Sequence, residues 1–202
     1  MKHYMKLLFC FALFMPSLTF AQKPEIYIDG ILGNNFIQLT EKSFVPLKVD
    51  PGLIIGAGLG VKYFDFRYEL EFTYRKNNYE EGCFIGKNTF LDYGKMEKYS
   101  CFLNLFYDFA FDFFMPFTKP YIGVGVGYHY DNESIELFIF DCWGDEQVYR
   151  YNFKDWGFSS QVLVGVGMQF TKFTNVKMGY RLLKDEKFIL HHALTLNVIQ
   201  NF

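Results

Sequence analysis

The C-terminal segment Phe188–Phe202 alternates apolar and polar residues with a period of two. Successive side chains of a β-strand point to opposite faces, whereas a helix repeats about every 3.6 residues. The pattern therefore predicts a strand with one apolar face and one polar face. The apolar parity comprises Leu190, Leu194, Leu196, Val198 and Phe202, and the polar parity comprises His191, Thr195, Asn197 and Asn201.

Seven other segments show the same alternation and are also predicted to be strands. The clearest is Phe66–Arg75, in which five apolar residues alternate strictly with five polar ones. No helix has that spacing. Together with the C-terminal segment they give eight strands, and the seven segments are Glu25–Gly33, Gly52–Tyr63, Phe66–Arg75, Tyr99–Phe109, Tyr121–Tyr130, Phe158–Phe170 and Lys177–Leu182.

The connections between the predicted strands alternate in length. Long polar loops are predicted after the first, third and fifth strands, at Asn34–Asp50, Lys76–Glu97 and Asp131–Asp155. The other connections are shorter, and Asp185–Lys187 is shorter than the alternation suggests. Outer-membrane barrels combine short periplasmic turns with long extracellular loops, and an even strand number places both termini in the periplasm. The predicted fold class is therefore all-β, an eight-stranded antiparallel up-and-down transmembrane β-barrel.

Alternation alone does not say which face of the barrel points outward, because a soluble eight-stranded barrel encloses its apolar face around a ligand. Three features favour an apolar exterior in contact with lipid. Most strand glycines lie on the polar parity, where they relieve crowding inside a narrow barrel. Aromatic residues lie near the ends of the apolar faces, as the interfacial girdles of membrane barrels require. The connection Ala110–Lys119 contains four phenylalanines, which suit a membrane surface.

With the apolar face outward, charged residues point into the lumen, where they are costly unless they are paired. We therefore expect Arg67 and Arg75 to meet the nearby carboxylates of Asp29, Glu69, Glu71 or Asp108. The interior of an eight-stranded barrel is just wide enough for its own side chains, so we expect a filled lumen, with a narrow channel as the alternative. The predicted polar network comprises Asp29, Lys62, Arg67, Glu69, Glu71, Arg75, Asn104, Asp108, Lys177 and Arg181.

The N-terminus has the features of a secretory signal peptide. Lys2 and Lys6 precede the apolar stretch Leu7–Met15, and the small residue Ala21 ends the segment. A charged start, a short apolar core and a small residue at the cleavage site are the signature of an exported chain. We expect cleavage after Ala21, so that residues 1–21 form the signal peptide and residues 22–202 form one β-barrel domain.

The charge pattern argues against nucleic-acid binding. The formal net charge is -2, and the 20 lysines and arginines are scattered along the chain. Nucleic-acid binding requires a concentrated basic surface. Half of the residues are hydrophobic, yet the mean hydropathy is only +0.02, as expected when apolar and polar residues alternate in strands.

Several of these patterns resemble the small outer-membrane β-barrel superfamily, which includes OmpA-type and OmpX-type barrels and the porin-family surface proteins. They are Thr19-Phe20-Ala21, the Gly-x-Gly strands Gly56–Gly60, Gly123–Gly127 and Gly165–Gly167, and the ending Leu194–Phe202. The resemblance implies the outer membrane of a Gram-negative bacterium, with outer-membrane lipid and lipopolysaccharide as surroundings. It also implies a barrel assembly machinery that reads the C-terminal strand and Phe202. The implied role is adhesion or envelope integrity through the extracellular loops, with an extracellular ligand that the residues do not identify and with no cofactor.

Three cysteines follow the predicted cleavage site, at Cys83, Cys101 and Cys142. An exported chain can form disulfides, and Cys83 and Cys142 lie in predicted outer loops, so they are the candidate pair. Cys101 lies on the lipid-facing parity and would remain a free thiol. No two cysteines have CxxC spacing, which argues against a zinc site or a redox pair. We therefore expect no metal and no cofactor.

One group of residues could carry catalysis. His129 has Asp131, Ser134, Ser159 and Ser160 close in sequence or across the predicted hairpin, and a serine, a histidine and an acid together can form a nucleophilic triad. Some small outer-membrane barrels are enzymes that modify lipid A or phospholipid acyl chains, so this activity is the alternative to a non-enzymatic role. The deacylase motif His-x-Ser-Asn is absent from the sequence. We therefore expect no enzymatic activity.

Two further sequence features carry little evidence for a bound ion. His191 and His192 are adjacent and point to opposite faces of a strand, so they are expected in the lumen and at the membrane interface, respectively, and not on one metal ion. The loop Asp141–Trp156 is rich in acidic and aromatic residues that could contact a partner or calcium. Its carboxylate spacing does not match a calcium-binding EF-hand loop.

Overall fold

The computed structural model describes residues 23–38, 49–79, 83–86, 89–111, 118–140, 146–186 and 189–202. These residues form antiparallel strands, and no described residue lies in a helix. The strands are β1 (Glu25–Gln38), β2 (Gly52–Tyr63), β3 (Phe66–Asn78), β4 (Cys83–Gly86), β5 (Thr89–Asp108), β6 (Thr118–Phe140), β7 (Glu146–Gln169), β8 (Thr174–Asp185) and β9 (Leu190–Asn201).

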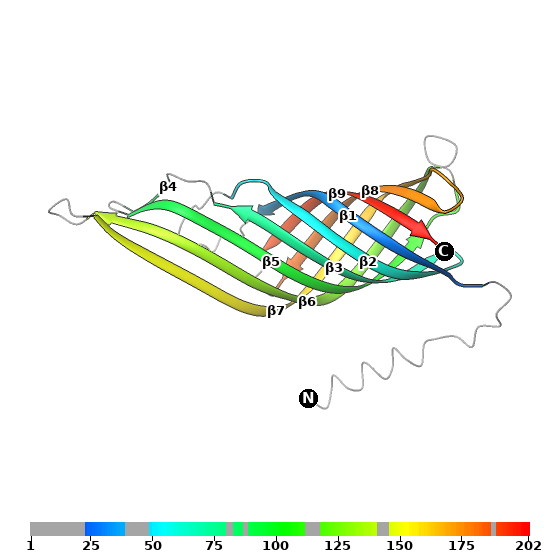
Figure 1. Ribbon diagram of the computed structural model, residues 1–202, viewed down its shortest axis with the longest axis horizontal. Helices are drawn as coiled ribbons and strands as arrows, with labels where there is room; N and C mark the ends of the chain where they lie inside the picture. The colour runs from blue at the N-terminus through cyan, green and yellow to red at the C-terminus, as the bar shows by residue number, and fades with distance from the viewer. Residues whose placement is uncertain are drawn as a thin grey trace, which may run out of the picture.

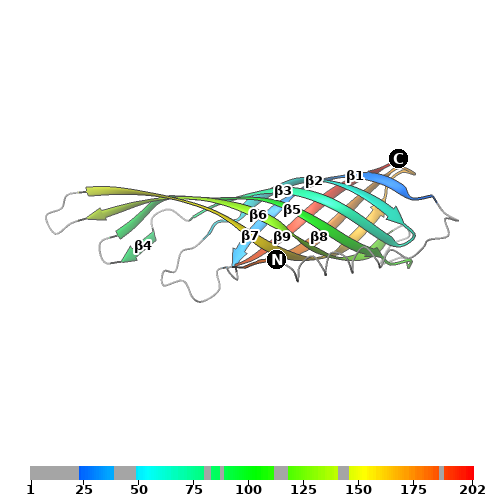
Figure 2. The same ribbon diagram turned by 90° about the horizontal axis from the view of Figure 1, so that it is seen from below.

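Eight of these strands close into a barrel (Figures 1 and 2). The order around the sheet is β3-β2-β1-β9-β8-β7-β6-β5, and pairing of β3 with β5 completes the ring. The ninth strand, β4, is short and pairs only with the start of β5. The predicted fold class and the predicted number of barrel strands are therefore confirmed.

Both ends of the described chain lie at one end of the barrel, which we call the terminal end. Tyr27 of β1 pairs with Asn201 of β9, and the amide of Phe202 donates to the carbonyl of Ile26 at 2.9 Å. The two-residue turn Phe64-Asp65 also lies there, and Phe64 has a positive φ of 54°. The opposite end, which we call the far end, carries the longest strands (Figure 1).

Two of the three predicted long loops are wrong over most of their length. The segment Asp131–Asp155 continues the β6–β7 ladder without interruption from Tyr130↔Trp156 to Phe140↔Glu146. The segment Lys76–Glu97 includes the end of β3, all of β4 and the start of β5. Beyond the membrane no lipid contacts the outer face of the sheet, so these strands need no apolar outer face, and in β7 that face carries Arg150, Asn152 and Lys154. Their overall composition therefore resembles that of a loop.

The barrel is apolar outside and polar inside, as predicted. Large apolar side chains on the outer parity are exposed, for example Leu103 (65%) and Met178 (66%), whereas Glu71 is completely buried in the lumen. The last strand follows the same division. Leu194 and Leu196 are exposed, and Thr195 is buried. A soluble barrel has the reverse arrangement, so the described surface is that of a transmembrane barrel.

Glycines allow bulky residues to fit inside this narrow barrel. Phe102 and Phe106 interrupt the polar parity of β5, and both are buried in the lumen opposite glycines of β6. A Cβ atom added to Gly123 would lie 2.4 Å from a ring carbon of Phe106. The sequence prediction of glycine on the crowded inner face is therefore confirmed at this position.

Some predictions concern residues outside the described part of the chain. The signal peptide and the cleavage after Ala21 fall there, as do Cys142 and most of the phenylalanine-rich connection. The disulfide between Cys83 and Cys142 stays a prediction. Cys101 is free and half-buried.

None of the described residues forms a helix long and apolar enough to cross a membrane.

Candidate functional site

At the terminal end of the lumen, two cations share one carboxylate. Nε of Arg67 lies 2.9 Å from Oδ2 of Asp108, and Nζ of Lys177 lies 3.3 Å from Oδ1. The Arg67 guanidinium also lies over the ring of Phe106, 4.2 Å from its centroid. Charge-assisted hydrogen bonds and the cation–π contact compensate for the removal of these cations from water.

Glu71 is the centre of a hydrogen-bond network in the middle of the lumen. Nη1 of Arg181 donates to its Oε1 at 2.6 Å, and the Asn104 amide donates to its Oε2 at 2.8 Å. The Gln161 amide donates in turn to the Asn104 side-chain oxygen at 2.8 Å. Glu71 lies on β3 and Arg181 on β8, four strands apart in either direction around the ring. The ion pair therefore joins opposite walls of the barrel.

The carboxylates of Asp29 and Glu69 are held by neutral donors. Asp29 accepts a hydrogen bond from the Asn197 amide at 2.7 Å, and Glu69 accepts one from the Tyr27 hydroxyl at 3.0 Å. Lys62 is only half-buried at the start of the lumen. The structure thus places the other predicted network residues inside the barrel and Lys62 at its terminal edge.

Of the two arginines expected to meet carboxylates, Arg67 does and Arg75 does not. Nη1 of Arg75 lies 3.3 Å from Oγ of Ser100, and Arg75 forms no ion pair with the described residues. Arg75 lies four residues further toward the far end of β3 than Glu71, which is paired with Arg181. Toward the far end from Glu71, the carboxylates of Asp131 and Asp185 are bound by another cation, Lys98.

Lys98 bridges two carboxylates at the far end of the lumen. Its Nζ lies 3.1 Å from Oδ1 of Asp131 and 3.0 Å from Oδ2 of Asp185. His191 lies beside them, with Nε2 at 3.9 Å from Oδ2 of Asp185. The prediction of His191 in the lumen is confirmed, although neither of its ring nitrogens forms a hydrogen bond with the described residues.

Sequence analysis missed several residues of the lumen. Lys98 and Asp185 were assigned to the edges of loops, and Tyr27, Gln161 and Asn197 were not included in the network. Each of them lies on the inward parity of its strand. Extending the alternation by one or a few residues includes Lys98 and Asp185, whereas Tyr27, Gln161 and Asn197 already lie within predicted strands. The partners themselves, such as Lys98 and Asp185, are 87 residues apart and meet only because the barrel closes.

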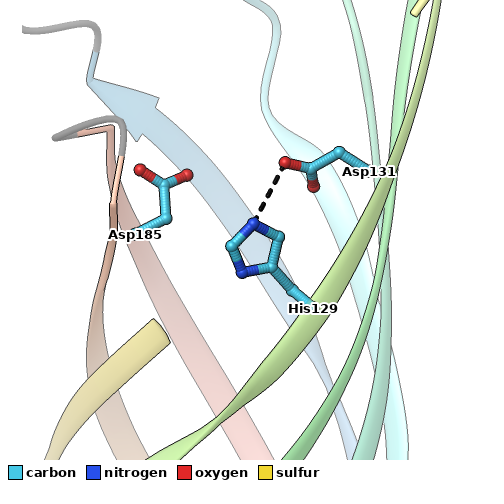
Figure 3. Close-up of side chains that lie close together, drawn as sticks. All are labelled: His129, Asp131 and Asp185. Atoms are coloured by element: carbon cyan, nitrogen blue, oxygen red, sulfur yellow. Dashed lines mark ion pairs between the residues drawn. The ribbon is translucent and has the colours of Figure 1, made fainter. Parts of the chain in front are cut away.

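The predicted serine, histidine and acid come together in the same cluster. Nδ1 of His129 lies 2.5 Å from Oγ of Ser159, and Nε2 lies 3.3 Å from Oδ2 of Asp131. Figure 3 shows the histidine between the two walls of the lumen with its ion pair to Asp131. The other serines do not join this group, because Ser160 is exposed on the lipid face and Ser134 donates to Asn152.

The surroundings of this group do not suit acyl transfer. A nucleophile must lie about 3 Å from the carbon that it attacks. Ser159 is 1% exposed and His129 is 3% exposed, and both point into the lumen, away from the bilayer. Asp131 is also engaged by Lys98. The contacts therefore form a buried hydrogen-bond network that an acyl chain in the membrane does not reach.

The same cluster contains the ligand atoms of a candidate cation site. The nearest atoms of His129, Asp131 and Asp185 all lie within 4.8 Å of one another. The Lys98 ammonium already lies within hydrogen-bond distance of both carboxylates, in the position that a divalent cation would need. The Lys98 ammonium therefore already bridges these two acids, and the donor set does not fit a metal ion.

Strands β5, β6 and β7 continue well beyond the barrel at the far end, and Figures 1 and 2 show them as a projecting sheet. We call the part beyond Tyr130 and Trp156 the projecting sheet. From Tyr130 to Phe140, β6 runs ten residues further, which is about 33 Å along the strand. On the opposite side of the far end, β8 ends at Asp185, so the barrel wall is shorter there than on the side of β6 and β7.

One edge of the projecting sheet has no strand beside it among the described residues. β7 pairs with β8 only from Ser159 to Gln169. The segment of β7 from Glu146 to Phe158 therefore has only β6 as a strand partner among the described residues. Its inward parity carries three exposed aromatic side chains. They are Tyr149 (40%), Tyr151 (43%) and Phe153 (55%).

The base of the projecting sheet is fixed by a small apolar cluster. Tyr79 and Met96 are buried there. The hydroxyl of Tyr79 donates a hydrogen bond to Glu133, which ties the end of β3 to β6. This cluster packs against Ile37, Val49, Ile135 and Leu137. The sheet thus continues the barrel wall as an ordered structure.

These features define the class of the protein. A closed ring of eight antiparallel strands, an apolar exterior and a lumen filled by ion pairs are the features of a small transmembrane β-barrel. The ion pairs of the lumen stabilise the barrel, whereas the projecting sheet carries the exposed aromatic side chains.

Comparison with solved structures places this fold among the small outer-membrane β-barrels. Neisserial surface protein A is similar over 90% of this chain and 100% of its own, with 19% sequence identity and a TM-score of 0.60. Ail of Yersinia pestis covers 89% and 97% with 12% identity and a TM-score of 0.45. The N-terminal β-barrel domain of Pseudomonas aeruginosa OprF covers 88% and 97% with 16% identity and a TM-score of 0.41.

No protein-family model matches the chain. No curated protein matches it in sequence either. The likeness therefore establishes the fold, and the functional conclusion rests on the residues of this chain.

Proposed function

We propose that this chain is a non-enzymatic integral protein of the Gram-negative outer membrane that binds an extracellular partner through its projecting sheet. In this orientation the terminal end faces the periplasm and the far end faces the exterior. The predicted signal peptide, the strand parity and the fold that it shares with Neisserial surface protein A support this location.

The exposed inner face of β7 carries the proposal. Three aromatic side chains stand in water on an unpaired strand edge, where they do not contribute to the barrel. The rings of Tyr151 and Phe153 stack with their centroids 6.2 Å apart and their planes at 10°. Contiguous exposed apolar surface on a folded protein marks an interaction site. An unpaired edge also offers main-chain hydrogen bonds to an extended partner segment.

The test removes most of the β6–β7 part of the projecting sheet and leaves the barrel. Ser134 and Asn152 are paired in register, so a two-residue Asn-Gly turn can replace residues 135–151. Bacteria that display the full protein are expected to adhere to host cells or to matrix-coated surfaces, and bacteria that display the shortened protein are expected to lose this adherence. Heat-modifiable migration on SDS gels checks that both barrels fold.

A matched pair of triple variants separates the aromatic face from the rest of the strand. Replacing Tyr149, Tyr151 and Phe153 by serine is expected to abolish adherence. Replacing Val148, Arg150 and Asn152 by serine changes the same strand on its other face and is expected to preserve most of it. Equal adherence of the full and shortened proteins would contradict the proposal.

A further inference from the structure

The outer surface of strands β3, β5, β6 and β7 carries two adjacent rows of residues in register. Along the aromatic row, neighbouring ring centroids are 4.9, 6.3 and 4.8 Å apart. The aromatic row consists of Tyr74, Tyr99, Tyr130 and Trp156. Immediately beyond it, toward the far end, the polar row consists of Lys76, Glu97, Asn132 and Lys154.

The carboxylate of the polar row is already neutralised. Nζ of Lys95 lies 2.7 Å from Oε1 of Glu97, and the Tyr74 hydroxyl donates to the same oxygen at 2.6 Å. The hydrogen bonds from Lys95 and Tyr74 hold the pKa of Glu97 below its usual range, so this side chain remains ionised and paired at neutral pH. Arg150 likewise lies 2.5 Å from Glu136 further out on the sheet.

Two cations of the polar row remain without a counter-charge. Lys76 and Lys154 are exposed, and neither forms an ion pair with the described residues. They lie three strand spacings apart along the row, which is about 14 Å. Asp50, beside Asn78 one row further out, adds a carboxylate near the Lys76 end of the row. The surface therefore retains positive charge at both ends of the row.

On the membrane side of the aromatic row the wall is hollowed. A shallow apolar groove there is lined by Ile55, Phe72, Cys101 and Tyr128, among other residues. Phe72, Cys101 and Tyr128 are in register on three neighbouring strands, and the small cysteine lies between the two larger rings. Trp156, at the end of the aromatic row, is 73% exposed. Tryptophan and tyrosine rings in such a belt lie at the boundary between lipid headgroups and acyl chains.

We propose that this wall binds a phosphorylated lipid with several acyl chains, in the leaflet that faces the far end of the barrel. Lys76 and Lys154 contact two phosphate groups of its headgroup, the aromatic row lies at the headgroup boundary, and the groove at Cys101 holds an acyl chain. In the orientation proposed above, this leaflet is the outer leaflet of the outer membrane. The site itself does not depend on the adhesive role of the projecting sheet.

The binding test uses the complete barrel in nanodiscs of phosphatidylcholine, with bisphosphorylated lipid A as the probe. Native mass spectrometry after release from the nanodisc counts the lipid A molecules that remain bound, and titration gives an apparent affinity. Lipid A without phosphate groups is the second probe. Stable binding of the phosphorylated probe and at least tenfold weaker binding of the dephosphorylated probe are expected.

Two double variants with the same loss of charge locate the binding. Removing one lysine near an anionic membrane surface weakens binding roughly fivefold, so Lys76→Gln with Lys154→Gln is expected to weaken it about thirtyfold at low salt. Lys119→Gln with Lys172→Gln removes two exposed lysines at the terminal end and is expected to leave the affinity unchanged. Equal affinities for the two double variants would overturn the proposal.

A third variant tests the groove without changing charge. Cys101→Phe fills the hollow between Phe72 and Tyr128 and is expected to reduce lipid A binding at least fivefold, whereas Cys101→Ser is expected to retain it. Unchanged binding by the phenylalanine variant would exclude an acyl chain from the groove. If the wall instead formed a dimer that the lysine substitutions disperse, with no lipid A bound, a second copy of the chain would be the occupant and the proposal would be wrong.

Discussion

Replacing Glu71 by glutamine is expected to destabilise the barrel far more than breaking an exposed ion pair of the same length. Glu71 and Arg181 lie 2.6 Å apart, and both are almost completely buried in the lumen. Removing the charge of Glu71 leaves Arg181 buried without its counter-ion. Breaking a buried pair in this way costs about 3–5 kcal/mol in the free energy of unfolding.

The exposed pair Arg150–Glu136 is the matched control, because its atoms are 2.5 Å apart and the Arg150 side chain is 73% exposed. Exposed ion pairs contribute about 0–1 kcal/mol to the free energy of unfolding. Arg150→Gln is therefore expected to change the free energy of unfolding by no more than that amount. The comparison varies burial while it keeps the length of the ion pair nearly constant.

The assay is reversible urea unfolding of the barrel in lipid vesicles, followed by tryptophan fluorescence and by heat-modifiable migration. A double variant completes the cycle: Glu71→Gln combined with Arg181→Met is expected to cost less than the sum of the single changes, by about 1–3 kcal/mol. If Glu71→Gln and Arg150→Gln had equal small effects, the lumen would be well solvated, and the filled interior argued above would be refuted.

Three further outcomes follow from the structure. Gly123→Ala is expected to destabilise the barrel by about 1–3 kcal/mol because the new Cβ would lie 2.4 Å from a ring carbon of Phe106, and Phe106→Leu should restore part of the loss in the same urea assay. Ser159→Ala is expected to leave the lipid A of expressing cells unchanged, and a difference in its mass spectrum would reinstate acyl chemistry at His129 and Asp131. Because the pKa of Glu97 is lowered in the folded protein, its contribution to stability is present above the usual value of 4.5 and is lost as the pH falls below it, so Glu97→Gln should weaken the acid dependence of unfolding.

The sequence predicted the barrel because the bilayer imposes a strict rule on each strand within it. Phe72 and Leu103 point outward and Glu71 and Asn104 point inward, and no other arrangement places apolar atoms in lipid. The projecting sheet was missed because the rule ends where lipid ends. Arg150 and Tyr151 are both in water, with the charged residue on the outer face and the aromatic residue on the inner face, so the division seen in the lipid-embedded strands is reversed.

The sequence predicts only part of the candidate site. His129, Asp131 and Ser159 lie on two consecutive strands, so the pairing within one hairpin brings them together. Lys98 and Asp185 meet across the closed barrel, and this contact depends on the register of every strand between them. The lysine that bridges the two aspartates of the cluster could not be assigned before the closure of the barrel was known.

Cysteine scanning of the last strand tests the central claim most directly. In a variant that lacks the native cysteines, single cysteines at positions 194–198 would carry an environment-sensitive fluorophore in lipid vesicles. Labels at Leu194, Leu196 and Val198 are expected to be quenched by brominated lipid, whereas those at Thr195 and Asn197 should be protected from it. Uniform quenching along the strand, or quenching at Thr195 and Asn197 alone, would contradict an apolar exterior around a filled polar lumen.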